Sequence, residues 1–313
     1  MPHKTRDGTK ATLLPKGEVL VTGGRAEPQL YDPATRKWTA TGNDGTPTEG
    51  TATLLPDGKV LVAGTNDRLQ PRAQLYDPAT RQWANTDEMK RTPAGESTAT
   101  LLKDGRVLVA GGLYPSAQLY NPGTGEWTAT DNMSLPRDGA TATLLPDGKV
   151  LVAGGNDEGD YTSSAELYDP TSGTWTATGD MSSLRGYGTA TLLRDGQVLV
   201  AGGNTGPSGP STAAELYNPK TGKWTTTGTM AQGRYRHSAT LLRDGRVLVA
   251  GGNGATDSPS TPYTSELYDP TTGKWTEAGR MPANHQGGAA VLLQDGRVLV
   301  AGGATTSADV YTP

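Results

Sequence analysis

Histidine, tyrosine and glutamate side chains capable of acid–base chemistry lie between the repeated segments of this chain. The sequence contains 3 histidines and 12 tyrosines. His237 follows Tyr235 by two positions, and His285, Glu49 and Glu96 occupy similar connecting stretches. An imidazole, a phenol and a carboxylate that meet in one place supply a general base, a general acid and a stabiliser of developing charge. These five residues are therefore the candidates for catalysis without a cofactor.

Arginine recurs at a fixed distance before the repeated segments. Each segment begins at the alanine of an Ala-Thr-Leu-Leu or Ala-Val-Leu-Leu run, and five residues earlier is a position that we call the arginine slot. The slot holds Arg6, Arg137, Arg185, Arg234 and His285 in five copies, and Pro47 and Ala94 in the other two. In those two copies Glu49 and Glu96 follow two residues further on. Because guanidinium groups bind carboxylates and phosphates through paired hydrogen bonds, the arginines are candidate ligand-binding residues.

Tyrosines outside the repeat add further candidates for binding. They stand in the connecting stretches, where a ring with a polar tip suits molecular recognition. The candidates of this kind are Tyr161, Tyr187 and Tyr263. With the four arginines they make up the predicted binding set.

Seven copies of one segment determine where these side chains lie. Ala52-Thr53-Leu54-Leu55-Pro56-Asp57-Gly58-Lys59-Val60-Leu61-Val62 is typical of them. The turn glycines are Gly17, Gly58, Gly105, Gly148, Gly196, Gly245 and Gly296, and neighbouring ones lie between 41 residues (Gly17 to Gly58) and 51 residues (Gly245 to Gly296) apart. Spacings in this range are typical of propeller blades.

Each copy predicts four antiparallel strands. An Asp-Gly turn joins the Thr-Ala-Thr-Leu and Val-Leu-Val-Ala runs into a hairpin, an Ala-Glu-Leu-Tyr run follows, and a Trp opens the fourth strand. The last copy stops at Tyr311-Thr312-Pro313, where no Trp follows. We therefore predict an all-β, seven-bladed β-propeller of four-stranded antiparallel blades, with a three-stranded seventh blade, in one domain over residues 1–313. Met1 to Lys10 could alternatively pair with that blade as an outer strand.

The variable connections of a four-stranded meander lie at one end of the blade. They join the fourth strand to the next first strand, and the second strand to the third. The first strand is innermost in a propeller, so we expect the arginine slot to surround the mouth of the central channel. The same end carries the tyrosines and histidines outside the repeat, which makes it the predicted functional face.

The repeat resembles the kelch motif of bacterial-type proteins. A Gly-Gly pair such as Gly154-Gly155 follows the second strand, and Tyr-Asp-Pro and Trp come after it. Arg234-Tyr235-Arg236-His237-Ser238-Ala239 is similar to the start of a kelch first strand. The resemblance implies a propeller of the galactose-oxidase-like superfamily. It also implies a second interpretation of the arginines, because the arginine of this family often packs against the adjacent blade.

Several kinds of chemistry are excluded by composition. Copper-radical oxidases that share this repeat need a Tyr–Cys cross-link, and the chain has no cysteine, so the resemblance does not extend to the copper site. The three histidines stand in separate stretches, and no glycine pair opens a helix, so we expect no metal and no cofactor. The net charge of −4 argues against nucleic acid as a partner.

Location and assembly follow from the same sequence. No apolar run is long enough to cross a membrane, and the first residues lack the apolar core of a signal peptide. The expectation is a cytoplasmic protein as written, or a secreted one if a leader has been removed. A closed propeller buries its core without a second copy, so we expect a monomer.

The favoured function is a ligand- or partner-binding module that uses the variable loops around the channel. Its partner would be a small anionic ligand, a carbohydrate or a protein. One alternative is a cofactor-free isomerase, epimerase, lyase or cyclase acting on a small anionic or sugar-like molecule. The other is a repeat-amplified scaffold without an evolved site. The one-sided placement of Tyr and His favours binding or catalysis, whereas the near-identity of the repeats favours the scaffold.

Overall fold

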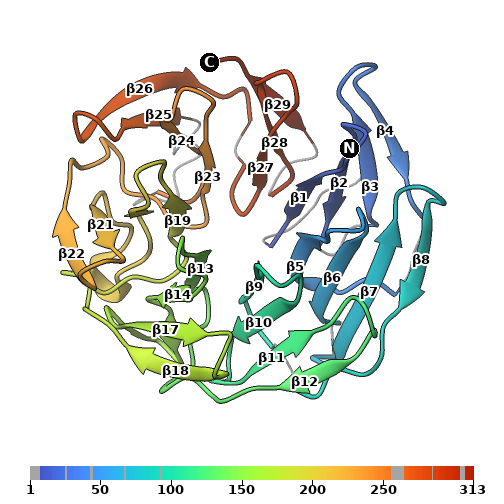
Figure 1. Ribbon diagram of the computed structural model, residues 1–313. Helices are drawn as coiled ribbons and strands as arrows, with labels where there is room; N and C mark the ends of the chain where they lie inside the picture. Colours follow the sequence, from blue (N-terminus) through green and yellow to red (C-terminus); the bar gives the residue numbers. More distant parts are fainter. Residues whose placement is uncertain are drawn as a thin grey trace.

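The repeated segments fold into seven antiparallel sheets that stand around a central axis, as Figure 1 shows. The computed structural model describes residues 8–24, 27–42, 45–66, 68–91, 94–254, 264–283, 285–303 and 307–313. Each sheet is one blade, and we number the blades 1 to 7 in chain order. The first strand of every blade lies nearest the axis, and the fourth lies at the periphery.

The strands of blades 1 to 3 follow the predicted pattern of four per repeat. Blade 1 contains β1 (Lys10–Leu13), β2 (Val19–Thr22), β3 (Gln29–Asp32) and β4 (Lys37–Ala40). Blade 2 contains β5 (Glu49–Leu54), β6 (Val60–Thr65), β7 (Pro71–Asp77) and β8 (Gln82–Asn85). Blade 3 contains β9 (Ser97–Leu101), β10 (Val107–Gly111), β11 (Ala117–Tyr120) and β12 (Trp127–Ala129).

Blades 4 to 6 keep this pattern, and blades 4 and 5 add short elements between the second and third strands. Blade 4 contains β13 (Thr141–Leu144), β14 (Val150–Ala153), β17 (Ala165–Asp169) and β18 (Thr174–Ala177), with the hairpin β15 (Asn156–Asp157) and β16 (Asp160–Tyr161). Blade 5 contains β19 (Thr189–Leu192), β20 (Val198–Ala201), β21 (Ala214–Asn218) and β22 (Lys223–Thr226), with the 3₁₀ helix η1 (Gly206–Ser208). Blade 6 contains β23 (Ser238–Leu241), β24 (Val247–Ala250), β25 (Thr264–Asp269) and β26 (Lys274–Arg280).

Blade 7 has three strands among the residues that the structure describes, which confirms the prediction. They are β27 (Ala289–Leu292), β28 (Val298–Ala301) and β29 (Ala308–Tyr311). The alternative that Met1 to Lys10 forms an outer strand here falls mostly on residues 1–7, which lie outside the described residues. Lys10 itself belongs to β1, where it pairs with Thr22.

The core consists of apolar layers between neighbouring blades. The Val-Leu-Val strands are buried on both faces, as a continuous apolar run predicts. Leu20 of blade 1 packs with Val60 and Tyr76 of blade 2, and the other neighbouring pairs repeat this arrangement. The ring closes in the same way, because Val19 and Val21 of blade 1 pack with Leu299 of blade 7. Within the described residues, side-chain packing therefore joins the last blade to the first.

Tyrosine and tryptophan of the repeat stabilise the outer half of each four-stranded blade. They face each other across the third and fourth strands, with ring centroids 4.9 Å apart for Tyr31 and Trp38 and 5.1 Å apart for Tyr268 and Trp275. The tilted geometry is favourable for aromatic pairs. These aromatic residues are structural, as the constant spacing between them predicts.

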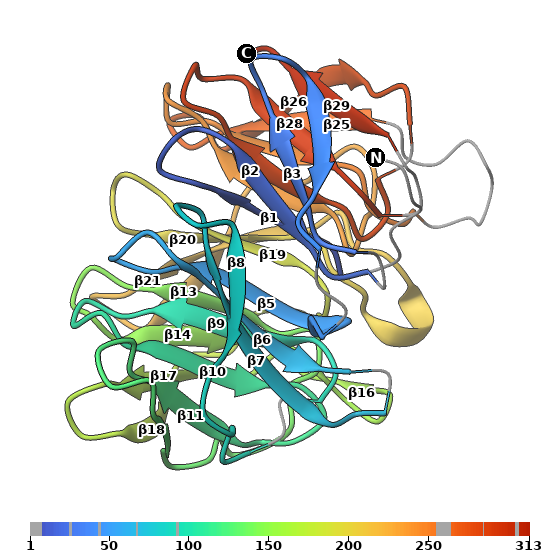
Figure 2. The same cartoon turned by 90° about the vertical axis from the view of Figure 1, so that its right-hand side faces the viewer.

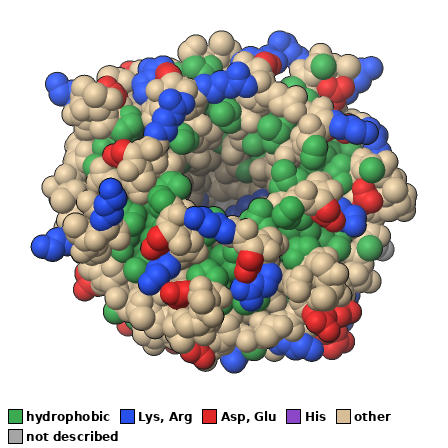
Figure 3. Space-filling view, viewed as in Figure 1, with side chains coloured by type: hydrophobic (Ala, Val, Ile, Leu, Met, Phe, Trp, Pro, Cys, Tyr) green, Lys and Arg blue, Asp and Glu red, His purple; other side chains and the backbone are tan. Residues whose placement is uncertain are grey.

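The two ends of the propeller differ. Figure 2 shows the blades from the side, with the hairpin that ends in β16 projecting at the right. Figure 3 shows the face seen in Figure 1, which is hollowed at its centre.

No helix among the residues that the structure describes has the length and apolar character needed to cross a membrane.

Candidate functional site

The structure places the described arginines of the arginine slot inside their own blades. Arg137, Arg185 and Arg234 are 0%, 2% and 0% exposed. Arg234 donates to the carbonyl oxygens of Gly251 and Thr264, and its Nη2 lies 2.8 Å from a carboxylate oxygen of Glu266. This differs from the expectation that they face the channel mouth. Each guanidinium turns outward from the axis toward the third strand of its blade, where backbone and carboxylate oxygens satisfy its charge.

The residue of the arginine slot contacts the third strand in blades 4, 5 and 7 as well. It is arginine in blades 4 and 5 and histidine in blade 7. Arg137 pairs with Glu166 at 3.0 Å, and Arg185 pairs with Glu215 at 2.6 Å. In blade 7, His285 is buried, and its ring nitrogens contact the Gly302 carbonyl at 3.0 Å and Asp309 at 2.9 Å. In blades 4 to 7 the slot residue therefore attaches the connection to the third strand. This is a structural role, but the contact lies within the same blade, whereas the resemblance implied packing against the adjacent blade.

The residue two positions after the arginine slot faces the channel instead. We call this position the inner slot, and it holds Gly8, Glu49, Glu96, Gly139, Tyr187, Arg236 and Gly287. Backbone hydrogen bonds link consecutive inner slots: Gly139 donates to Glu96 at 3.1 Å, Tyr187 to Gly139 at 2.6 Å, Arg236 to Tyr187 at 2.7 Å and Gly287 to Arg236 at 3.0 Å. This backbone chain runs around the channel mouth from blade 3 to blade 7.

The inner slot requires a left-handed backbone in blades 4 to 7. Gly139 and Gly287 have φ of 64° and 65°, which glycine adopts without strain. Tyr187 and Arg236 have φ of 57° and 51° at the same position. A non-glycine residue pays about 1 kcal/mol or more for this conformation. Two blades therefore carry strained residues where their neighbours carry glycine.

The side chains of these two residues bind carboxylates of blade 3 and of the connection between blades 3 and 4. Arg236 Nη2 lies 2.8 Å from Glu96 Oε1, and its guanidinium carbon lies 4.7 Å from the centre of the Tyr187 ring. The Tyr187 hydroxyl donates to Asp138, whose other carboxylate oxygen accepts from the Glu96 backbone N–H at 2.6 Å. Glu96, Asp138, Tyr187 and Arg236 thus form a closed network, which we call the mouth cluster.

Electrostatics fix the protonation state of Tyr187. Burial, and the hydrogen bond to the Asp138 carboxylate, raise the pKa of the Tyr187 phenol well above its ordinary value. The phenol therefore stays protonated at neutral pH and acts as a donor. Tyr161 of β16 packs edge-on against it, with ring centroids 6.4 Å apart.

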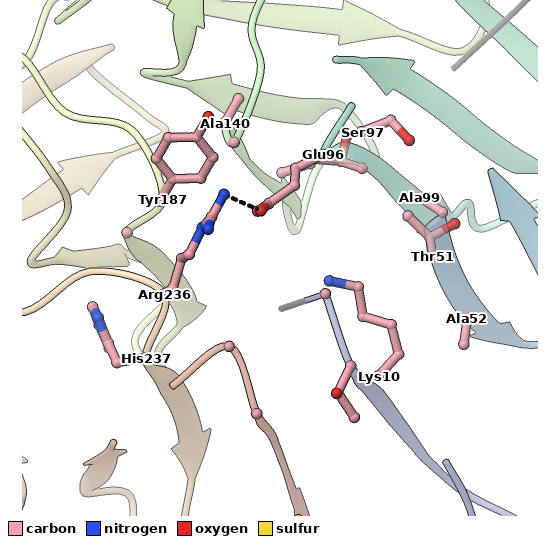
Figure 4. A pocket seen from close by; sticks show the side chains of 18 residues that line it. Lys10, Thr51, Ala52, Glu96, Ser97, Ala99, Ala140, Tyr187, Arg236 and His237 are labelled. Atoms are coloured by element: carbon pink, nitrogen blue, oxygen red, sulfur yellow. Dashed lines mark ion pairs between the residues drawn. The ribbon is translucent and has the colours of Figure 1, made fainter. Parts of the chain in front are cut away.

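A cavity of about 320 Å³ opens beside the mouth cluster and receives residues from all seven blades. Figure 4 shows Glu96 and Arg236 joined across it, with Tyr187 behind them and the Lys10 side chain extending from blade 1 toward them. Lys10, Glu96 and Arg236 are the charged side chains among the described lining residues. Lys10 has no ion-pair or hydrogen-bond partner for its ammonium group within the described chain. The remaining wall is made of small residues, such as Thr51, Ser97 and Gly188.

His237 also lines this cavity, but as a neutral imidazole. Its Nε2 lies 2.9 Å from the Thr189 hydroxyl, and its Nδ1 has no partner among the described residues. Burial, together with the nearby Arg234 charge, lowers the pKa of His237 to about 3. The ring is therefore uncharged at neutral pH.

The other predicted residues lie apart from the cavity or outside the described residues. Glu49 occupies the inner slot of blade 2 in β5 but does not line the cavity, and Tyr235 forms a backbone bridge with Asn253. Of the candidates, Glu96, Tyr187 and His237 contribute to the cavity wall. Arg6 and Tyr263, like His3, are not among the described residues.

Sequence analysis missed Arg236, Asp138 and Lys10. Arg236 stands where blades 4 and 7 have glycine, so comparison of the inner slots would have identified it. Lys10 stands directly before the first alanine, where five other blades have Thr or Ser and one has Ala289. A departure from the repeat at a channel-facing position was the available signal for both.

Known proteins share the fold and part of the repeat. The model of the Kelch motif matches residues 141–182 and 185–231, which cover blades 4 and 5. A solved structure of a fungal alcohol oxidase of the AA5 family, in complex with copper, is 18% identical over 100% of this chain and 75% of that chain, with a TM-score of 0.81. No curated protein matches the sequence. At 18% identity the similarity establishes the fold. Within the described part of this chain, no three His, Asp or Glu residues are grouped as metal ligands.

Proposed function

We propose that this chain, a kelch-repeat β-propeller, binds a small acidic molecule in the cavity at the mouth of its central channel. The observation that carries the proposal is the left-handed backbone at Tyr187 and Arg236. Strained residues tend to persist where their side chains have a function. Here the strain directs a phenol and a guanidinium into a cavity that glycine would leave without them.

The charges of the cavity favour an anion. Lys10 and Arg236 are positive and Glu96 is negative, which leaves one positive charge on the described wall. The Arg236 charge is shared with Glu96, whereas the Lys10 ammonium faces the cavity without an ion-pair partner among the residues that the structure describes. A carboxylate or phosphate group would supply that partner, because both accept charge-assisted hydrogen bonds from ammonium groups.

The rest of the wall favours a ligand rich in hydroxyl groups. Glu96 accepts hydrogen bonds, and Thr51 and Ser97 bring side-chain oxygens to a wall otherwise made largely of glycine and alanine. Small residues leave room for a compact polar molecule in about 320 Å³. We therefore propose a sugar acid or a similar hydroxylated acid as the ligand class.

Binding is favoured over acid–base turnover by the state of the two imidazoles. An efficient general base has a pKa near the working pH, whereas the pKa of His237 is lowered to about 3. His285, the second candidate, is 1% exposed and engages Asp309 and a backbone carbonyl. His237 is therefore a poor general base at neutral pH, and His285 does not line the cavity.

Calorimetry and thermal melting with matched variants test this function. We expect glucuronate or galacturonate to raise the melting temperature of the intact protein more than glucose does, because the acid group binds Lys10. Lys10→Gln and Arg236→Gly should each weaken binding at least about tenfold, the equivalent of 1.4 kcal/mol. Lys103→Gln, in a turn between a first and a second strand, is the matched control and should bind as the parent does.

Arg236→Gly separates a binding role from a structural one. Glycine relieves the left-handed strain, while loss of a partly exposed ion pair costs about 0.2–1 kcal/mol. We therefore expect the melting temperature without ligand to change little. Lack of response to every acid tested would refute the proposal, and so would an Arg236→Gly variant that binds like the parent.

A further inference from the structure

One ion pair crosses the mouth of the channel and joins two blades that are not neighbours in the ring. Glu96 belongs to the connection that enters blade 3, and Arg236 belongs to the connection that enters blade 6. Glu96 Oε1 lies 2.8 Å from Arg236 Nη2, and the two side chains are 30% and 28% exposed. Figure 4 shows the pair at the cavity, with Lys10 on the other side of the opening. A carboxylate of the protein therefore occupies a cation of the ligand site.

Backbone contacts fix the position of both residues. The Glu96 N–H donates to the Asp138 carboxylate at 2.6 Å, and the Glu96 carbonyl accepts from the Gly139 N–H at 3.1 Å. The Arg236 N–H donates to the Tyr187 carbonyl at 2.7 Å, and the guanidinium carbon lies 4.7 Å from the centre of the Tyr187 ring. Both residues of the ion pair are therefore anchored in the mouth cluster.

The ion pair leaves one positive charge on the described wall for a ligand. The charged side chains of this wall are Lys10, Glu96 and Arg236, and the pair of Glu96 with Arg236 has no net charge. A ligand with one acid group neutralises Lys10 and leaves the pair in place. A ligand with two acid groups brings a second negative charge close to Glu96, and like charges repel each other. The second acid group then has no cation of its own in the cavity.

We infer that Glu96 determines specificity by restricting the ligand to one acid group, an inference that rests on the proposed function of the cavity. The Glu96 carboxylate competes with a second acid group of the ligand for Arg236. A site that leaves the wrong ligand with an unpaired charge discriminates against it without any loss of contacts to the right one. The ligand class is therefore a hydroxylated monocarboxylic acid rather than a diacid with a carboxylate at each end.

Two acids of matched shape measure this selectivity by calorimetry at pH 7. Gluconate and glucarate share the same hydroxylated chain, and glucarate has a second carboxylate where gluconate has a hydroxymethyl group. Both are fully ionised at this pH. We expect the parent protein to bind gluconate roughly tenfold more tightly than glucarate. Glu96→Gln keeps the shape of the side chain and gives the wall two positive charges, so glucarate should become the tighter ligand.

Two further variants show whether the charge inside the cavity is the cause. Glu49 occupies the same inner slot in blade 2 and does not line the cavity, so Glu49→Gln changes the net charge of the protein equally and should keep the preference of the parent. The double variant Lys10→Gln with Glu96→Gln returns the wall to one positive charge, and gluconate should again be the tighter ligand. Each preference is a ratio within one variant, so a difference in the fraction of folded protein cancels.

Glucuronate, titrated in parallel, separates failure of this inference from failure of the proposed function. Binding of glucuronate without a reversal between gluconate and glucarate in Glu96→Gln overturns the inference and leaves the proposed function in place. A reversal in Glu49→Gln as well would assign the effect to overall charge and also overturn it. Absence of binding by all three acids refutes the inference together with the proposed function.

Discussion

Single residues that depart from the repeat distinguish the cavity from the scaffold. The first strands and their turns are nearly identical from blade to blade, and their side chains pack in the same way. Tyr187 and Arg236 accept a left-handed backbone that Gly139 and Gly287 adopt without strain. Lys10 replaces a small residue and extends into the cavity. These three residues bring polar side chains to the channel mouth. The equivalent positions of blades 4 and 7 hold glycine or another small residue.

His237 should make the stability of the protein depend on pH. Its pKa is about 3 in the folded state and about 6.5 in an unfolded chain, so only the unfolded state gains a proton between these values. Stability from this residue is therefore complete above pH 6.5 and falls as the pH decreases toward 3. Between pH 7 and pH 5 the loss should be about 2 kcal/mol.

Urea unfolding of the parent and of His237→Gln measures this effect. The variant keeps a neutral polar side chain and lacks the titration, so its stability should decrease less between pH 7 and pH 5. Carboxylates titrate in both proteins and cancel in the comparison. Equal pH dependence in the two proteins would mean that His237 is accessible to protons in the folded state.

At the scale of elements, one contact attaches the connection to the third strand of the blade in blades 4 to 7. In blades 4 to 6 this contact is a buried Arg–Glu pair, and in blade 7 it is His285 with Asp309. In blade 3 the same two positions hold Ala94 and Gln118, and the Gln118 side chain binds the backbone of Lys90 and Arg91 instead. The connection is therefore held by a charged pair in blades 4 to 6 and by a neutral amide side chain in blade 3.

Removal of one partner of the charged pair should lower the stability of the protein more than removal of both. Arg234→Ala leaves the Glu266 carboxylate buried without its cation, which typically costs about 3–5 kcal/mol. The double variant Arg234→Ala with Glu266→Gln copies the residues of blade 3 and removes the buried charge. We expect the double variant to be the more stable of the two in urea unfolding. A double variant that is less stable than Arg234→Ala would show that the carboxylate is satisfied without arginine.

The same contacts explain how far the sequence could predict the site. Repetition predicted the blades, their strands and the missing fourth strand of blade 7, because hydrophobic period and turn chemistry are local. It did not predict that Arg137, Arg185 and Arg234 turn away from the channel, since residue spacing does not give side-chain direction. One signal was available, because Glu occupies the third strand in blades 4 to 6, where blades 1 to 3 have Gln. The left-handed backbone at Arg236 also had a signal, because Gly139 and Gly287 occupy the same slot in blades 4 and 7.

At the scale of the whole molecule, the ring closes between blade 1 and blade 7, whose described sheet has three strands instead of four. Blade 7 joins blade 1 through the layer of Val19, Val21 and Leu299, with β1 beside β27. Blades 4 and 5 have four strands each and share a larger apolar layer that includes Met181 and Trp224. Stability in repeat architectures is approximately the sum of each unit and its interfaces with its neighbours. The ring should therefore open first at the junction of blades 7 and 1.

Hydrogen exchange measured by mass spectrometry on the intact protein tests this order. Amides that open locally exchange sooner than those released only by global unfolding. We expect β28, which is central in its blade, to exchange faster than β14 and β20, although all three are Val-Leu-Val-Ala strands buried throughout. The comparison is matched in sequence, so intrinsic exchange rates and side-chain burial do not differ among them. Equal protection of the three strands would mean that the ring unfolds as one cooperative unit and that the packed junction is as strong as a complete blade.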